Sequence, residues 1–246
     1  MNVALAKTEC SDCPIRHSAV CAAVDPAELE ILQDLKSYRT YPAGASLAMA
    51  GENLNHLSSL VSGCATMSRG FEDGRRQTVG LLLPSDFIGR PGRMKSAYDI
   101  VAISEVTLCR FERKRFEKLL IETPNIATRL LAMTLDELEA ARDLAVTLGR
   151  RTAREKVASF LASLARRQAS VLKSDAPRSP FTLKLPLTRL AMADHLGLTI
   201  ETVSRQLTQL RKDGIIAPID NREIAIPDFD SLLLEAGEDD DGGPLD

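Results

Sequence analysis

Apolar and polar residues alternate in short runs over residues 38–111, and glycines separate these runs at near-regular intervals. The clearest runs are residues 57–61 and 78–83, and a longer run, residues 100–111, closes the series. Short alternating segments broken by turn residues are typical of antiparallel strands in a roll or barrel. The pattern therefore predicts a β-roll. The separating glycines are Gly44, Gly51, Gly63, Gly70 and Gly74.

Helical spacing of apolar residues precedes and follows this region. Residues 25–35 begin with an aspartate that can cap a helix and a proline suited to its first position. Residues 113–122 are expected to form a short helix that stops before Pro124. Residues 125–148 contain neither glycine nor proline, so they predict a long helix, with Gly149 at its end.

The long helix carries a repeat in alternating steps of three and four residues, the spacing of a coiled-coil seam. Small Ala141 and Ala145 would let two such helices approach closely, which favours a homodimer. The alternative is an amphipathic helix packed on its own domain. The predicted seam residues are Leu131, Thr134, Leu138, Ala141, Ala145 and Leu148.

Charge is distributed unevenly along the chain. The formal net charge is −3, yet residues 150–227 contain 14 Lys and Arg against 7 Asp and Glu. A basic module on an acidic chain suggests a polyanionic partner for that module, and a solvated charged helix surface is the plain alternative. No apolar run approaches the roughly 20 residues of a membrane helix, and residues 1–9 lack a secretory signal. A cytoplasmic protein with no membrane partner is therefore expected.

Residues 187–216 have the pattern of a helix-turn-helix. Gly197 permits a sharp turn after a first helix, and Thr199 can cap a second one. The second helix has an apolar stripe, expected to be buried, and two small strands should follow it as a wing. The stripe consists of Val203, Leu207 and Leu210. In this part of the chain, helices are expected over residues 152–168, 187–196 and 200–213, and the two strands over residues 215–218 and 223–226. Residues 170–180 are expected to form a loop, and the acidic residues 235–246 are expected to be disordered.

The second helix also presents a polar set near its N-terminus, on the side opposite the stripe. Glu201, Ser204 and Arg205 are spaced so that they project together. Arg205 can bond guanine O6 and N7, Glu201 can accept from cytosine N4, and Ser204 can contact a base or a phosphate. The sequence thus predicts a partner of double-stranded DNA, with Thr199 and Arg189 as further contacts.

Cysteines form a second pattern. Cys10, Cys13 and Cys21 lie close together, whereas Cys109 and Cys64 each stand alone. In a reducing compartment clustered thiols indicate metal ligands or redox sensors rather than disulfides. A [4Fe–4S] cluster and a tetrahedral zinc ion both need four ligands, and a thiol–disulfide switch is a third possibility. We expect Cys64 to be a small buried residue, and His17 to be an exposed loop residue.

The segment Gly-Leu-Thr-Ile-Glu-Thr-Val-Ser-Arg at 197–205 closely resembles the recognition helix of the FNR subgroup of the CRP/FNR family of bacterial transcription regulators. The resemblance covers nearly the whole chain. It implies an α+β fold: a β-roll like that of cyclic-nucleotide-binding domains, a long dimerisation helix and a winged helix-turn-helix. The implied divisions are a cysteine-rich segment 1–24, a sensor 25–122, a dimerisation helix 123–149, a DNA-binding domain 150–230 and an acidic tail 231–246.

The resemblance also implies roles for particular residues. Glu201, Ser204 and Arg205 would read a TTGAT-like half-site in an inverted repeat, as a homodimer that acts on RNA polymerase; the loop 70–76 is a candidate contact for the polymerase. Oxygen would degrade the cluster, loosen the seam and weaken DNA binding. The implied ligands of the [4Fe–4S] cluster are Cys10, Cys13, Cys21 and Cys109.

This chain departs from the resembled proteins at three places. The gap between Cys13 and Cys21 is longer than in the best-known member of the subgroup, and Ala141 is apolar where the subgroup has an acidic residue nearby. Residues 86–102 lack the Gly-Glu-Leu turn of cyclic-nucleotide sites, and Lys95-Ser96-Ala97 is a weak echo of the phosphate clamp. Cyclic nucleotide is therefore not the expected effector, although the cations Arg90, Arg93 and Lys95 remain in this stretch.

Overall fold

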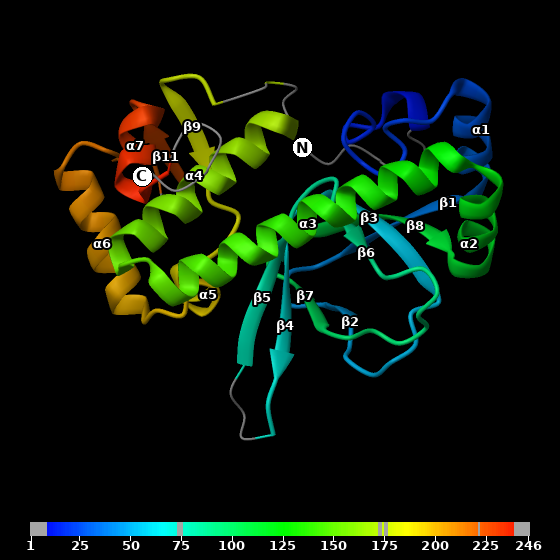
Figure 1. The fold of residues 1–246 in the computed structure, drawn as a ribbon, viewed down its shortest axis with the longest axis horizontal. Helices are drawn as coiled ribbons and strands as arrows, with labels where there is room; N and C mark the ends of the chain where they lie inside the picture. Colours follow the sequence, from blue (N-terminus) through cyan, green and yellow to red (C-terminus); the bar gives the residue numbers. More distant parts are fainter. Residues whose placement is uncertain (1–8, 73–75, 172–173, 175–176, 221, 239–246) are drawn as a thin grey trace. The chain divides into compact units, whose positions relative to one another are not determined.

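The computed structural model describes residues 9–72, 76–171, 174, 177–220 and 222–238 (Figure 1). The chain forms two compact units, the first ending at Ala140 and the second beginning at Ala141. In the first unit the elements are a 3-10 turn Cys10–Asp12, α1 Pro26–Leu35, β1 Lys36–Tyr41, β2 Ser46–Ala48, β3 His56–Ser62, β4 Ala65–Gly70, β5 Arg76–Leu82, β6 Phe87–Ile88, β7 Asp99–Ala102, β8 Val106–Glu112 and α2 Arg113–Glu122. Helix α3, Pro124–Arg150, begins in the first unit and ends in the second.

The strands of the first unit form two four-stranded antiparallel sheets, ordered β1-β8-β3-β6 and β2-β7-β4-β5. This arrangement confirms the predicted β-roll. The turn from β3 to β4 requires glycine, because Gly63 has a φ of +90° and an added Cβ would lie 2.0 Å from the carbonyl oxygen of Glu105. Cys64 follows in this turn and is fully buried, as expected.

Alternation along β8 divides the first unit into two cores. Val106 and Leu108 face the core between the two sheets. Cys109 and Phe111 face the opposite side, where the N-terminal cysteine segment, α1, α2 and the start of α3 cover the sheet. Successive strand residues point to opposite faces, so this one strand contributes to both cores. Cys109 lies in the core against which Cys13 and Cys21 also pack.

The helices of the first unit begin where the sequence predicts. Asp25 accepts a hydrogen bond from the backbone of Glu28, whose side chain accepts in return from the backbone of Asp25, a capping box at the start of α1. The prediction that Gly149 ends the long helix is wrong, because α3 continues through it to Arg150. Gly149 does not adopt the left-handed conformation of a glycine cap, and Lys156 Nζ instead donates to the Leu148 carbonyl oxygen at 3.1 Å.

The second unit contains α4 Ala153–Val171, α5 Arg189–Leu196, α6 Ile200–Lys212 and a three-stranded sheet ordered β10-β11-β9. The expected wing strands correspond to β10 Ala217–Pro218 and β11 Glu223–Ile226. Strand β9, Phe181–Lys184, was not predicted; it pairs antiparallel with β11. None of the described helices is both long and apolar enough to cross a membrane.

The expected acidic tail from residue 231 is a second correction, because α7, Phe229–Ala236, occupies its first part. Asp228 caps the helix, and Gly237 ends it in the left-handed conformation. The buried face of α7 consists of Phe229, Leu232, Leu233 and Ala236. Apolar packing therefore overrides the local acidic composition; residues 239–246 lie outside the described residues.

Candidate functional site

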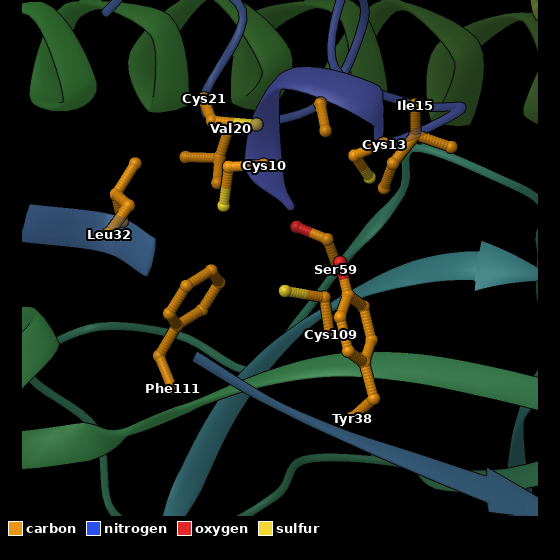
Figure 2. A pocket seen from close by; sticks show the side chains of 11 residues that line it. Cys10, Cys13, Ile15, Val20, Cys21, Leu32, Tyr38, Ser59, Cys109 and Phe111 are labelled. Carbon is orange, nitrogen blue, oxygen red and sulfur yellow. The ribbon is translucent and has the colours of Figure 1, made fainter. Parts of the chain in front are cut away.

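All four predicted cysteine ligands line one pocket of the first unit (Figure 2). Cys10, Cys13 and Cys21 come from the N-terminal segment, and Cys109 comes from β8, about 90 residues further along the chain. The rest of the lining is apolar apart from two hydroxyl side chains. These other lining residues are Ile15, Ala19, Val20, Leu32, Phe111, Tyr38 and Ser59.

The N-terminal segment is anchored so that its thiols face the sheet. Ile15, Ala19 and Val20 are buried in the same core as Cys109. The guanidinium of Arg16 donates to the carbonyl oxygens of Cys21 and Val24, which closes the loop after Cys13. The long gap between Cys13 and Cys21 is therefore taken up in an ordered loop that keeps Cys21 on the pocket.

Burial is the largest cause of the raised pKa of Cys10, Cys21 and Cys109. It raises the pKa of Cys109 well above the usual range and that of Cys21 to about 11, and the neighbouring cysteines add to both effects. Burial also raises the pKa of Cys10, although Lys36, with Nζ at 3.4 Å from its sulfur, opposes the shift. A redox-sensor thiol needs a low pKa and exposure, whereas the pKa of Cys10, Cys21 and Cys109 is raised and Cys109 is buried. A metal cation in the pocket would favour their thiolate forms.

The chemistry of the lining fits a sulfur-ligated group. The hydroxyl oxygens of Tyr38 and Ser59 are buried, and neither has a hydrogen-bond partner in the part of the chain that the structure describes. The Tyr38 hydroxyl lies near the Cys13 thiol without hydrogen-bonding geometry, and burial followed by the charges of the nearby thiols raises its pKa, so it keeps its proton. Among the described residues, no three Cys, His, Asp or Glu side chains lie close enough to hold a single metal ion.

The cysteine segment is also bonded to the start of α3. Arg129 donates to the carbonyl oxygen of Ser18 at 2.6 Å and to that of Ala19 at 3.4 Å. Asn125 donates to both carboxylate oxygens of Glu28 at 3.0 Å. The contacts of Arg129 thus link the cysteine segment directly to the long helix, and residue spacing could not show them because they join residues 110 or more positions apart.

In the second unit, α5 and α6 form a helix-turn-helix with the predicted turn chemistry. Gly197 ends α5 with a φ of +61°, and the Thr199 hydroxyl accepts from the backbone of Thr202 at 3.2 Å at the start of α6. Of the predicted stripe, Val203 and Leu210 are fully buried and Leu207 is half-buried. The core of the motif is therefore the one that the sequence predicts.

The predicted base readers lie together at the N-terminal end of α6. Glu201 and Arg205 are exposed and Ser204 is half-buried. Backbone and Thr199 hydrogen bonds at the helix start lower the pKa of Glu201, which keeps it an ionised acceptor. Arg189, the first residue of α5, reaches Ser204 with Nη1 at 3.4 Å from the hydroxyl oxygen. The Thr199 hydroxyl caps α6, and its contact with DNA stays a prediction.

Comparison with known proteins gives the same division of the chain. A family model described as "Cyclic nucleotide-binding domain" matches residues 38–123, and one described as "Crp-like helix-turn-helix domain" matches residues 155–234. The transcriptional activator protein FnrL of Cereibacter sphaeroides is 54% identical over 95% of this chain and 94% of its own length. The chain belongs to the CRP/FNR family of transcription regulators.

Other members of the CRP/FNR family share the fold. The nitrogen fixation regulation protein FixK of Bradyrhizobium diazoefficiens is 39% identical over 85% of this chain and 86% of its own. The solved structure of FixK2 from Bradyrhizobium japonicum superposes with a TM-score of 0.72 at 30% identity, covering 80% of this chain and 96% of that one. The family consists of DNA-binding regulators rather than enzymes.

The predicted seam of α3 leaves apolar side chains exposed in this chain. Leu131 is 60% exposed, and Leu138 is also exposed. Thr134, Ala141 and Ala145 are exposed and Leu148 is half-buried. Leu135 and Val146 lie outside the predicted seam and are also exposed on this helix. The apolar surface is therefore wider than the predicted seam.

The cations that the sequence singled out in the β-roll of this CRP/FNR regulator lie outside the cysteine pocket. Arg90, Arg93 and Lys95 are exposed in the loop before β7, and none of them lines the cysteine pocket. Ser96 is buried and donates to the Tyr98 carbonyl oxygen at 2.7 Å. Of the candidate polymerase loop 70–76, residues 73–75 lie outside the described residues.

Proposed function

We propose that this regulator is an oxygen-responsive transcription activator that holds a [4Fe–4S] cluster on Cys10, Cys13, Cys21 and Cys109. It acts in the cytoplasm as a homodimer on a TTGAT-type inverted repeat and engages RNA polymerase. The convergence of the four thiols on one otherwise apolar pocket carries the proposal. The 54% identity to the activator FnrL supports it.

Similarity favours a cluster over a single zinc ion. Both groups can be held by four thiolates, and all four cysteines line one pocket. The 54% identity to the FNR-type activator FnrL makes the cluster the better-supported of the two. The burial of Cys109 and the raised pKa of Cys109 and Cys21 also disfavour the thiol–disulfide alternative.

When bound, the cluster would supply iron–thiolate bonds between the cysteine segment and β8, and without them the segment would keep only its own packing and hydrogen bonds to the rest of the unit. This segment is held against the sheet by the buried side chains of Ile15 and Val20 and against α3 by Arg129. A shift of the segment therefore changes the packing and hydrogen bonds of the first turns of α3. Coupling of this kind alters DNA affinity only as far as the two states differ in stability.

The homodimer is proposed from the uncovered apolar surface of α3. Exposed leucines in regular steps along one helix cost free energy in water and match the spacing of a coiled-coil partner. Two copies would then present two copies of α6, as an inverted repeat requires. Ala141 adds no charge to this surface, so it does not push two cluster-free copies apart. Exposure to air is therefore expected to weaken DNA binding more than it dissociates the dimer.

Protein purified without oxygen is expected to contain iron and acid-labile sulfide in equal amounts, with broad visible absorbance from sulfur-to-iron charge transfer. Exposure to air should bleach this absorbance and weaken binding to a TTGAT palindrome, measured by fluorescence anisotropy. Calorimetry with cAMP should show no heat of binding. Zinc in place of iron, or DNA affinity that air leaves unchanged, would contradict the proposal.

The second prediction concerns base reading by Arg205. The variant Arg205→Ala should lose about 1–3 kcal/mol of binding free energy per half-site, because a bidentate contact to guanine is removed. It should also bind equally well to sites with and without the G·C pair of TTGAT. Arg211→Ala, an exposed arginine near the far end of α6, is the matched control and should keep the base preference. If Arg205→Ala kept the preference for the G·C pair, Arg205 would not be one of the base-reading residues.

A further inference from the structure

Two hydroxyl groups in the cysteine pocket have no role in ligation. The oxygens of Tyr38 and Ser59 are buried and have no hydrogen-bond partner among the described residues. Ser59 is only 2% exposed, and both side chains line the pocket. Burying a hydroxyl without a partner is costly, so two such groups on one otherwise apolar surface indicate a polar ligand.

The register of the sheet places both hydroxyls beside one ligand. Tyr38 on β1 and Ser59 on β3 are each the direct cross-strand partner of Cys109 on β8. Directly paired residues have Cβ atoms about 4.5–5.5 Å apart and point to the same face. Figure 2 shows the three side chains rising together from the strands toward the cysteine segment. Cys109 is thus the centre of a row with a hydroxyl donor on each side.

We propose that Tyr38 and Ser59 are positioning residues that donate hydrogen bonds to the iron-bound sulfur around Cys109, either its thiolate or an adjoining sulfide. This inference rests on the proposed function. Hydrogen bonds to the sulfurs are one of the features that set the reduction potential of an iron–sulfur cluster. Donors at this row stabilise the electron-rich cluster and slow its loss in air. The two hydroxyls therefore set how much oxygen the sensor tolerates before it switches.

The test uses Tyr38→Phe, Ser59→Ala and the double variant of the full-length protein, each loaded with cluster without oxygen. Each single variant should lose its visible absorbance in air about fivefold faster than the wild type, as the loss of one hydrogen bond implies. Resonance Raman spectra should show a smaller D₂O shift of the Fe–S stretching bands. The thermal unfolding midpoint of the metal-free variants should be unchanged or higher, because a buried group without a partner is removed.

Matched controls come from the other face of the same strands. Ser58→Ala on β3 and Tyr41→Phe on β1 change the same atoms where they face away from the pocket. These controls should decay in air at the wild-type rate. Wild-type protein that takes up no iron or sulfide would refute the proposed function itself. Wild-type protein that holds the cluster while both variants match its decay rate and its D₂O shift would refute only the role of the hydroxyls.

Discussion

Cys109→Ser protein prepared without oxygen is expected to carry no stable cluster and to bind the palindrome no better than air-exposed wild type. Cys109 is the one proposed ligand that comes from the sheet, so without it a cluster on the three segment thiolates would have no bond to β8 and only side-chain packing would hold the segment there. A serine hydroxyl is a poor replacement for an iron-bound thiolate. The iron and acid-labile sulfide contents of this variant should fall to the background of the assay. DNA affinity should fall roughly 5- to 150-fold, the usual range of allosteric coupling.

The same variant tests the route to α3. Amide hydrogen exchange in residues 125–133 should be faster in Cys109→Ser than in cluster-loaded wild type, because the cysteine segment that accepts from Arg129 is then less firmly held. Cys64→Ala is the control, since Cys64 is equally buried but lies in the turn between β3 and β4. A Cys109→Ser protein with full iron and sulfide content would show that β8 supplies no ligand.

The parts of the protein predicted well from sequence are those whose signals are local. The turn between α5 and α6 needs a left-handed residue and a cap within three positions, and Gly197 and Thr199 supply both. The alternation and glycine turns that predict the β-roll are also local patterns. The ligand set came from the family resemblance, and in the structure these four cysteines line one pocket.

The parts that sequence could not predict depend on contacts between distant residues. Tyr38 and Ser59 look ordinary in the sequence, and only the register of β1, β8 and β3 places them beside Cys109. The bonds of Arg129 to the cysteine segment need the fold of the whole first unit. Helix α7 was missed for another reason: its acidic neighbours suggested disorder, but arginines from α4 and the residues before it neutralise them.

Glu238 shows why the end of this unit is ordered. It is only 5% exposed and lies just after the Gly237 cap of α7. Its carboxylate accepts from Arg151 in the connection between α3 and α4, from Ser159 and from Arg166, the last at 2.9 Å. The three donors satisfy the hydrogen-bonding capacity of this buried carboxylate. Removing its negative charge would leave the two arginines without an anionic partner.

Glu238→Gln is therefore expected to destabilise the DNA-binding unit by about 3 kcal/mol, toward the lower end of the range for breaking a buried pair because Arg166 is partly exposed. Hydrogen exchange of α4 and α7 in the full-length chain, followed at increasing urea, measures this unit separately from the β-roll. Glu235→Gln is the matched control; its ion pair with Arg154 is more exposed and should contribute about 1 kcal/mol or less. Equal losses in the two variants would mean that burial of Glu238 adds nothing and that apolar packing alone holds α7 in place.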